Sequence, residues 1–158
     1  MAIYDRATVI DAPLSEVWAF HSTLDGLRAL TPGLAGMEIG AVRYPDGDHD
    51  PDELLAGTEI EMRVRPLGIL PGEEWTSEIT ERTRGEGEAR FRDVMHDGPF
   101  ERWEHTHRFL AVDDRTVVYD RLSFALPRPF GFLTPAVRMG IAALFAYRHA
   151  RTRSLLGR

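Results

Sequence analysis

The stretch FRDVMHDGPFERWEHTHRFLAVDDRTVVYDRLSFAL, residues 91–126, decides the fold that we expect for this chain. It has the alternating pattern of three consecutive β-strands, in which every second side chain points to the same face of a sheet. Trp103, His105, His107 and Phe109 therefore share one face. The opposite face carries a polar set that points to solvent: Arg102, Glu104, Thr106 and Arg108. Two histidines thus point toward the core, where a polar group needs a partner or serves a ligand.

The dipeptide Asp113-Asp114 predicts a two-residue hairpin turn, because Asp tolerates the left-handed dihedrals that such a turn requires. Pairing Val112 with Arg115 then sets the register of the hairpin. The resulting inward-facing pairs are His107 with Asp120, His105 with Leu122, Trp103 with Phe124, and Phe109 with Val118. On the preceding strand, a loop over residues 97–101 places Asp93 opposite His105. That second pairing is the weaker inference, since a slip of one residue would break it.

The predicted register brings Asp93, His105, His107 and Asp120 together on the concave side of a sheet. Two interpretations stay open. The four residues can be structural Asp–His pairs that hold the register of the strands, because such ion-pair networks also occur outside functional sites. Alternatively, they line a cavity and orient a bound molecule, as the few polar groups of an otherwise apolar pocket do.

Length and composition limit the classes of function. A chain of 158 residues with 43% hydrophobic side chains is expected to form one domain over residues 1–158. Its formal net charge of -6 argues against nucleic acid or an anionic membrane as the main partner. The first residues, MAIYDRATVI, alternate like a strand rather than a signal peptide, and the chain has no cysteine. We therefore expect a cytoplasmic protein.

The amino acids that are missing exclude several chemistries. All 19 residues counted as Lys or Arg are arginines, and the chain contains no Lys, Asn, Gln or Cys. Schiff-base lysines, cysteine nucleophiles, thiolate metal sites and a phosphate-binding P-loop lysine are therefore excluded. Any chemistry must come from His, Asp, Glu, Arg, Tyr, Ser, Thr or the backbone.

The remainder of the chain predicts an antiparallel sheet with helices at two places. We expect a first strand over residues 3–10, then a short helix with Asp11 as its N-cap, and a second short helix over about residues 24–30. Further strands are expected over residues 36–44, 58–66, 74–83 and 88–96. The acidic loop of residues 46–53 opens like a calcium loop but lacks the Gly and Glu that this motif needs, so we interpret it as a solvated loop.

A long helix is expected at the end of the chain, with Thr134 as its N-cap and Gly157 just beyond its last residue. Its apolar stripe consists of Val137, Ile141, Leu144, Phe145 and Leu155. The apolar run of residues 136–147 is too short to span a bilayer, so we expect no stable membrane insertion. We assign the arginines near its end to solubility and to the helix dipole: Arg148, Arg151, Arg153 and Arg158. The predicted fold class is α+β, a curved, mostly antiparallel seven-stranded sheet around this helix, with two short helices after the first strand.

Several motifs resemble those of the START-like, or SRPBCC, superfamily, which has the helix-grip fold of polyketide cyclases, lipid-transfer domains and birch-pollen-type allergens. The resemblance covers essentially the whole chain, and its motifs are Ala12-Pro13, Glu16–His21, Leu30-Thr31-Pro32, Trp75–Ile79, Phe91-Arg92-Asp93, Gly98-Pro99-Phe100, Trp103–His107, Asp120, Leu126-Pro127 and Phe145–Arg148. It implies a deep cavity between the sheet and the last helix that takes apolar or amphipathic small molecules. It implies no single reaction, because the fold does not determine the function.

The leading hypothesis is the binding of a hydrophobic or amphipathic small molecule, such as a lipid, an isoprenoid or a polyketide-like ring, without a cofactor. Asp93, His105, His107 and Asp120 would hold a hydroxyl or carbonyl group of this ligand. The apolar walls would come from Trp18, Phe20, Met62, Trp75, Phe91, Trp103, Phe109, Phe124, Ile141, Leu144 and Phe145.

Two alternatives use the same cluster. The first is a cofactor-free acid–base enzyme, a cyclase, dehydratase or isomerase, with His107 held by Asp120 as the base and His105 with Asp93 as the acid. The second is a metal site, since His-x-His on one strand face beside a carboxylate is a geometry that zinc and iron enzymes use. We rank the metal site last, because each histidine already has an acidic partner in the predicted register.

Overall fold

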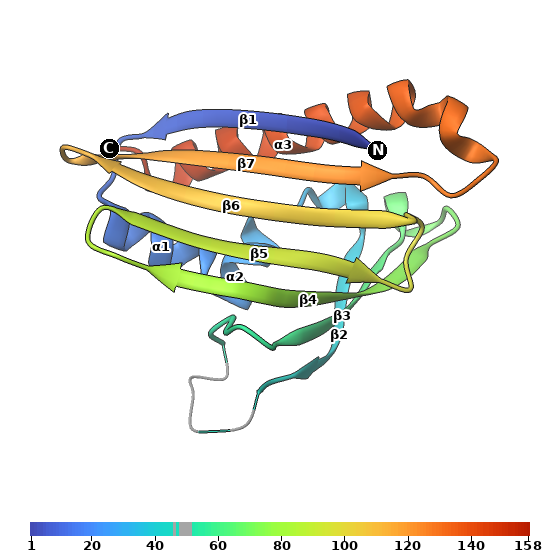
Figure 1. Ribbon diagram of the computed structural model, residues 1–158, viewed down its shortest axis with the longest axis horizontal. Helices are drawn as coiled ribbons and strands as arrows, with labels where there is room; N and C mark the ends of the chain where they lie inside the picture. Colours follow the sequence, from blue (N-terminus) through green and yellow to red (C-terminus); the bar gives the residue numbers. More distant parts are fainter. Residues whose placement is uncertain (46, 48–51) are drawn as a thin grey trace.

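The computed structural model describes residues 1–45, 47 and 52–158. Its centre is one antiparallel seven-stranded sheet with the strand order β1-β7-β6-β5-β4-β3-β2 (Figure 1). The strands are β1 Ala2–Ile10, β2 Met37–Arg43, β3 Glu59–Val64, β4 Glu73–Arg84, β5 Glu88–His96, β6 Arg102–Val112 and β7 Arg115–Ala125. The helices are α1 Leu14–His21, α2 Leu24–Ala29 and α3 Thr134–Leu156, with 3-10 turns η1 Gly33–Ala35, η2 Pro66–Gly68 and η3 Phe130–Leu133. The predicted α+β architecture is confirmed.

The register of the central strands is the one that alternation and turn chemistry predict. Val112 pairs with Arg115, and His107 lies opposite Asp120. Asp113 in the turn has a φ of 55°, the left-handed conformation that a two-residue hairpin requires. The pairing of Asp93 with His105 is also confirmed. Both histidines are therefore fixed on the inner face by backbone pairing on both sides of β6.

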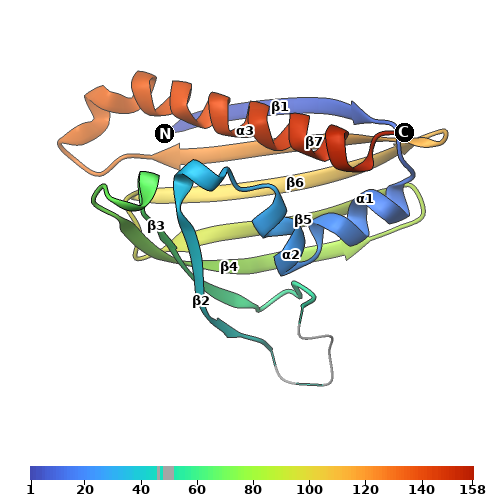
Figure 2. The same ribbon diagram turned by 180° about the vertical axis from the view of Figure 1, so that it is seen from behind.

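All three helices lie on the same face of the sheet (Figure 2). Helix α3 runs along β1 and β7, whereas α1 and α2 lie over the middle strands. Two apolar clusters result. One packs Val17 and Trp18 of α1 against the middle of the sheet, and the other packs Ile141 and Phe145 of α3 against β1 and β7.

The predicted helix caps are wrong at two of three positions. Helix α1 begins after Pro13, which is extended and has no side chain that can accept a hydrogen bond, so Asp11 lies too far upstream to cap it. Thr134 is already helical because η3 precedes it, and its hydroxyl donates to the carbonyl oxygen of Gly131 at 2.7 Å. Gly157 does follow the last residue of α3, as expected.

The length of the last helix also differs from the expectation. By length and hydropathy alone, residues 130–156 form a helix long and apolar enough to cross a membrane. The apolar run of residues 136–147 therefore underestimates the length of this segment, because η3 and α3 together cover residues 130–156. The absence of membrane insertion stays a prediction. The interpretation of the acidic loop falls largely on residues 46 and 48–51, which lie outside the described residues.

Candidate ligand-binding cavity

A cavity of about 310 Å³ lies between the inner face of the sheet and the helices. Most of its wall is apolar and comes from α2, α3 and strands β3 to β6. Eight of the predicted ligand-binding residues line it: Met62, Trp75, Phe91, Asp93, Trp103, His105, His107 and Phe145. The ring of Phe91 stacks on His107 with centroids 4.1 Å apart, and Phe145 meets His105 edge-on at 4.9 Å. The polar end of the cavity is therefore bounded by aromatic rings.

Three further predicted residues, Asp120, Phe124 and Ile141, are not part of this wall. Phe124 and Ile141 are buried in the apolar cluster between α3 and the sheet, and Asp120 lies behind the histidines. Among the additional aromatic candidates, Trp18 and Phe109 belong to the core under α1. Leu144 does line the cavity, whereas Phe20 does not.

Asp120 is the centre of the polar cluster. Its Oδ1 lies 2.9 Å from Nε2 of His105, and its Oδ2 lies 2.6 Å from Nε2 of His149, and both contacts are hydrogen bonds. Nδ1 of His107 approaches the same Oδ1 to 2.7 Å, but without the alignment that a hydrogen bond requires. One buried carboxylate thus contacts three imidazole rings from one strand and one helix.

Asp93 lies on the other side of the two strand histidines. Its Oδ1 is 3.5 Å from Nδ1 of His105 and also 3.5 Å from Nε2 of His107. Both distances exceed the usual length of an N–H···O hydrogen bond, about 2.7–3.2 Å. We expected two separate pairs, His107 with Asp120 and His105 with Asp93. Instead, the imidazoles of His105 and His107 each lie between the two carboxylates.

The charged groups of the cluster shift one another's pKa values. Burial raises the pKa of Asp120, but the neighbouring His107 and the contacts with His105 and His149 outweigh it, so this pKa lies well below its ordinary value. Burial also raises the pKa of Asp93, but contacts with His105 and His107 outweigh it, and this pKa is again lowered. For His105, burial lowers the pKa, yet the hydrogen bond to Asp120 and the proximity of Asp93 raise it above its ordinary value. Both carboxylates are therefore ionised at neutral pH.

Sequence reasoning missed two members of the site on α3. His149 is buried and hydrogen-bonded to Asp120, and Arg148 lines the cavity. The assignment of Arg148 to a solvating basic group is therefore wrong. The spacing offered a signal: Phe145 and His149 are four residues apart and therefore share one face of a helix. Among the described residues, no carboxylate forms an ion pair with Arg148, and its guanidinium lies 5.8 Å from the ring centre of Phe145.

His21 on α1 is a further buried histidine beside the cavity. Its Nδ1–H donates to the carbonyl oxygen of Val17 at 2.8 Å, and its Nε2 lies 3.5 Å from Oγ1 of Thr152 on α3. Burial lowers its pKa from 6.5 to about 3, more than the bond to Val17 raises it. His21 is therefore neutral at physiological pH.

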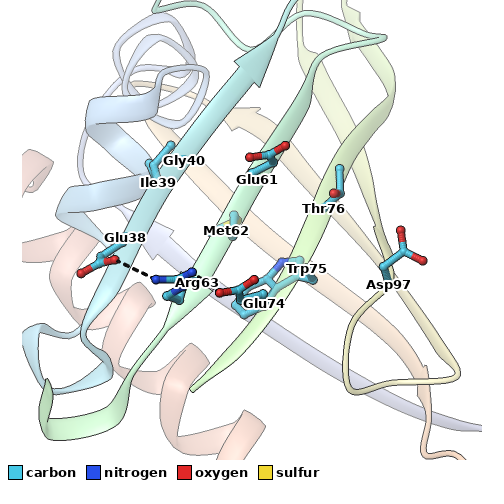
Figure 3. A pocket seen from close by; sticks show the side chains of 10 residues that line it. All are labelled: Glu38, Ile39, Gly40, Glu61, Met62, Arg63, Glu74, Trp75, Thr76 and Asp97. Atoms are coloured by element: carbon cyan, nitrogen blue, oxygen red, sulfur yellow. Dashed lines mark ion pairs between the residues drawn. The ribbon is translucent and has the colours of Figure 1, made fainter. Parts of the chain in front are cut away.

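A second, more open hollow lies over strands β2, β3 and β4 (Figure 3). Arg63 in this hollow lies between Glu38 and Glu74 and pairs with both. Arg63 and Glu74 are more than half exposed. Exposed ion pairs of this kind are typical of a solvated sheet face, so we place the functional site at the inner cavity.

Comparison with solved structures identifies the class of fold. A START superfamily protein from Mycobacterium smegmatis aligns over 98% of this chain and 96% of its own, with 10% identity and a TM-score of 0.67. Norcoclaurine synthase from Thalictrum flavum, solved with dopamine and hydroxybenzaldehyde, aligns over 98% of this chain and 86% of its own, with 17% identity and a TM-score of 0.65. The protein TTHA0849 from Thermus thermophilus aligns over 98% of this chain and 99% of its own, with 20% identity and a TM-score of 0.61. The fold is that of the START-like superfamily, as the sequence motifs indicate.

The family within this fold follows from the sequence. Residues 8–156 match the model of a domain of unknown function, DUF8410, and the chain belongs to that family. A search of curated proteins finds no match.

Proposed function

We propose that the protein binds a compact amphipathic small molecule in the inner cavity. The observation that carries this proposal is the composition of the cavity wall: most of its side chains are apolar, and Asp93, His105, His107 and Arg148 are among its few polar members. A few placed polar groups in an apolar pocket are the usual arrangement of a small-molecule site. The START-like fold of solved proteins, one of them holding two aromatic molecules, supports the same assignment.

The dimensions and charges of the cavity narrow the class of ligand. Its volume of about 310 Å³ is near the lower limit of ligand sites, roughly 300–1,000 Å³. A short isoprenoid or a one- or two-ring polyketide-like molecule suits this volume better than a lipid with two long chains. The carboxylate of Asp93 and the guanidinium of Arg148 both line the cavity, so a neutral hydroxyl or carbonyl group meets both an acceptor and a donor there.

The test compares two tryptophan substitutions on the same helix. Leu144 lines the cavity, whereas the preceding Ala143 is exposed. Leu144→Trp fills the cavity and should lower the affinity for the uncharged fluorophore N-phenyl-1-naphthylamine by at least about tenfold, since a blocked pocket excludes the probe. Ala143→Trp is the matched control and should bind the probe like the wild type.

Native mass spectrometry of gently purified protein, compared with the denatured mass, should show an organic ligand in the wild type and not in Leu144→Trp. Equal binding of the fluorophore by all three proteins, or by none of them, would contradict the proposal.

A second candidate function is cofactor-free proton transfer within the same cavity. It is favoured by one observation: His105 turns one ring nitrogen to Asp120 and the other toward Asp93 at the cavity wall. A carboxylate that fixes the tautomer of an imidazole also raises its basicity. His105→Ala should then abolish turnover of a bound cyclisable or dehydratable substrate while ligand binding persists. Loss of binding and turnover together would remove this candidate.

A further inference from the structure

We propose that Asp93, His105 and His107 form a binding site for a divalent transition metal ion of the zinc, cobalt or iron(II) type. Each of the three residues offers one ligand atom, and the three atoms lie within 4.8 Å of one another. The two histidines come from the same face of β6, and Asp93 lies directly opposite His105 on β5. Backbone pairing therefore holds the three ligands on rigid, adjacent strands.

The spacing of the donor atoms fits a metal ion better than hydrogen bonds. Oδ1 of Asp93 lies 3.5 Å from both Nδ1 of His105 and Nε2 of His107. Hydrogen bonds at this length are weak. Bonds of about 2.1 Å from zinc to nitrogen or oxygen place neighbouring donors about 3.4 Å apart at the tetrahedral angle. The carboxylate and the two ring nitrogens are therefore separated by about the edge of a zinc coordination tetrahedron.

The ring nitrogen of His105 that faces away from Asp93 has a partner of the kind found in metal sites. Nε2 of His105 is hydrogen-bonded to Asp120, which is itself fixed by the hydrogen bond from His149. In metal sites a carboxylate commonly accepts the second ring N–H of a histidine ligand, which fixes the tautomer that coordinates the ion. In its neutral form, with the proton on Nε2, His105 directs the lone pair of Nδ1 at an oxygen of Asp93. A cation between these two atoms replaces the repulsion with coordination.

The charges and the position of the site are also suited to an ion. Two carboxylates, Asp93 and Asp120, flank the two strand histidines, and their negative charge attracts a dication. The three proposed ligands line the cavity, whereas Asp120 and His149 do not. The remaining coordination positions therefore face the ligand cavity. The chain has no cysteine, and imidazole with carboxylate suits zinc, cobalt and iron(II).

The experiment uses the full chain without an affinity tag, freed of metal by a chelator. Addition of Co²⁺ should produce the visible absorption bands of a four-coordinate site at one ion per chain, and Zn²⁺ should displace it in a calorimetric titration. His105→Ala and His107→Ala each remove a ligand and should lower the Zn²⁺ affinity by more than about 100-fold. Asp120→Asn removes only the second partner of a ligand and should lower it by about 10- to 100-fold.

His96→Ala is the matched control. His96 is about half exposed and lies beside Glu78 on the surface, so its loss removes an imidazole without changing the cluster. This variant should bind both ions like the wild type. Circular dichroism of each variant checks that the fold is retained.

The wild-type titration decides the proposal even if a variant fails to fold. Absence of Co²⁺ absorption and of Zn²⁺ heat at millimolar ion would overturn it, as would a wild-type affinity in His105→Ala. Weakening in His96→Ala equal to that in His105→Ala would show binding away from the cluster and would also overturn it. The proposal does not rest on the ligand: metal-free protein that still binds N-phenyl-1-naphthylamine separates the two proposals.

Discussion

The two halves of α3 differ sharply in how they are held. In the first half, Met139 is 75% exposed, and Phe132 of the preceding η3 is 76% exposed. In the part from residue 141 to residue 156, which we call the second half, Ile141, Phe145, His149 and Thr152 are at most 6% exposed. Figures 1 and 2 both show the first turns of α3 extending beyond the start of β1. The helix is thus a firmly packed segment with a loosely packed extension.

The difference shows that the same part of α3 contributes both to the polar cluster and to the packing of the helix on the sheet. The second half carries both the apolar contacts with β1 and β7 and the hydrogen bond from His149 to Asp120. The first half has Val137 against the same apolar cluster and a hydrogen bond from Arg138 to the carbonyl oxygen of Ile3. The residues that build the cavity end are therefore also those that dock the helix.

The largest effect is expected from Phe145→Ala, which removes the central apolar contact of the second half. The ring is 2% exposed and packs on Tyr4 and His105. Its loss should lower the free energy of unfolding by about 3–5 kcal/mol, because a large buried ring leaves a cavity. Urea denaturation measures this, with Met139→Ala as the exposed control. Equal losses in both variants would show that the two halves do not differ in packing.

His149→Leu is expected to have the next largest effect. It keeps an apolar side chain on the helix but removes a hydrogen bond to an ionised carboxylate, so we expect a loss of about 1.5–3 kcal/mol. The same denaturation measurement with His96→Ala, which removes an exposed partner of Glu78, should show a loss of no more than about 1 kcal/mol. An unchanged free energy of unfolding in His149→Leu would mean that the contact with Asp120 does not hold α3 on the sheet.

A pH effect is expected where α1 meets the second half of α3. The pKa of His21 falls from 6.5 to about 3 on folding, so between these values the unfolded chain binds the extra proton and acid destabilises the fold. From pH 6.5 to 5 the metal-free protein should lose roughly 1.5–2 kcal/mol. The raised pKa of His105 stabilises the fold. This stabilisation is fully present below pH 6.5 and is lost only at higher pH, so it does not change in this window. The lowered pKa values of Asp93 and Asp120 act only at lower pH, near and below their ordinary value of 3.8.

His21→Phe isolates this contribution, since it fills the site without a titratable group. Its free energy of unfolding, measured by urea denaturation at pH 5, 5.75 and 6.5, should change less with pH than that of the wild type. Parallel curves for the two proteins would assign the acid sensitivity to another group.

The smallest effect is expected from Phe132→Ser at the exposed end of η3. Because the side chain is 76% exposed, its replacement should change the free energy of unfolding by no more than about 0.5 kcal/mol. Thermal denaturation provides the measurement. A loss as large as that of Phe145→Ala would mean that another molecule or another part of the chain covers this end in solution.

The sequence predicts the strands of the site better than the helix of the site. Alternation along β6 and the Asp113-Asp114 turn suffice to place His105, His107 and Asp120, because strand pairing propagates from one fixed turn. The contribution of α3 is harder to derive. Its first half is apolar on nearly every side, so the pattern defines the inward face only through Ile141 and Phe145, and the four-residue spacing from Phe145 to His149 is a weak signal.

The sequence also does not predict which inward-facing residues line the cavity and which are buried in the core. Trp103 and Phe124 are directly paired on the inner face, yet only Trp103 lines the cavity. The difference arises from the position of α3, which covers Phe124 and leaves Trp103 partly free. Alternation assigns a side chain to a face of the sheet, but only tertiary packing decides whether that face is filled.

The position of Asp120 has a consequence for how a molecule enters the cavity. Separation of the second half of α3 from the sheet would strip a buried carboxylate of the hydrogen bond from His149, which makes this a slow and costly opening. The first half of α3 has no comparable buried attachment among the described residues. We therefore expect exchange between the cavity and solvent to be governed by the opening rate of the first turns, while the end that holds Asp120 stays closed on the same timescale.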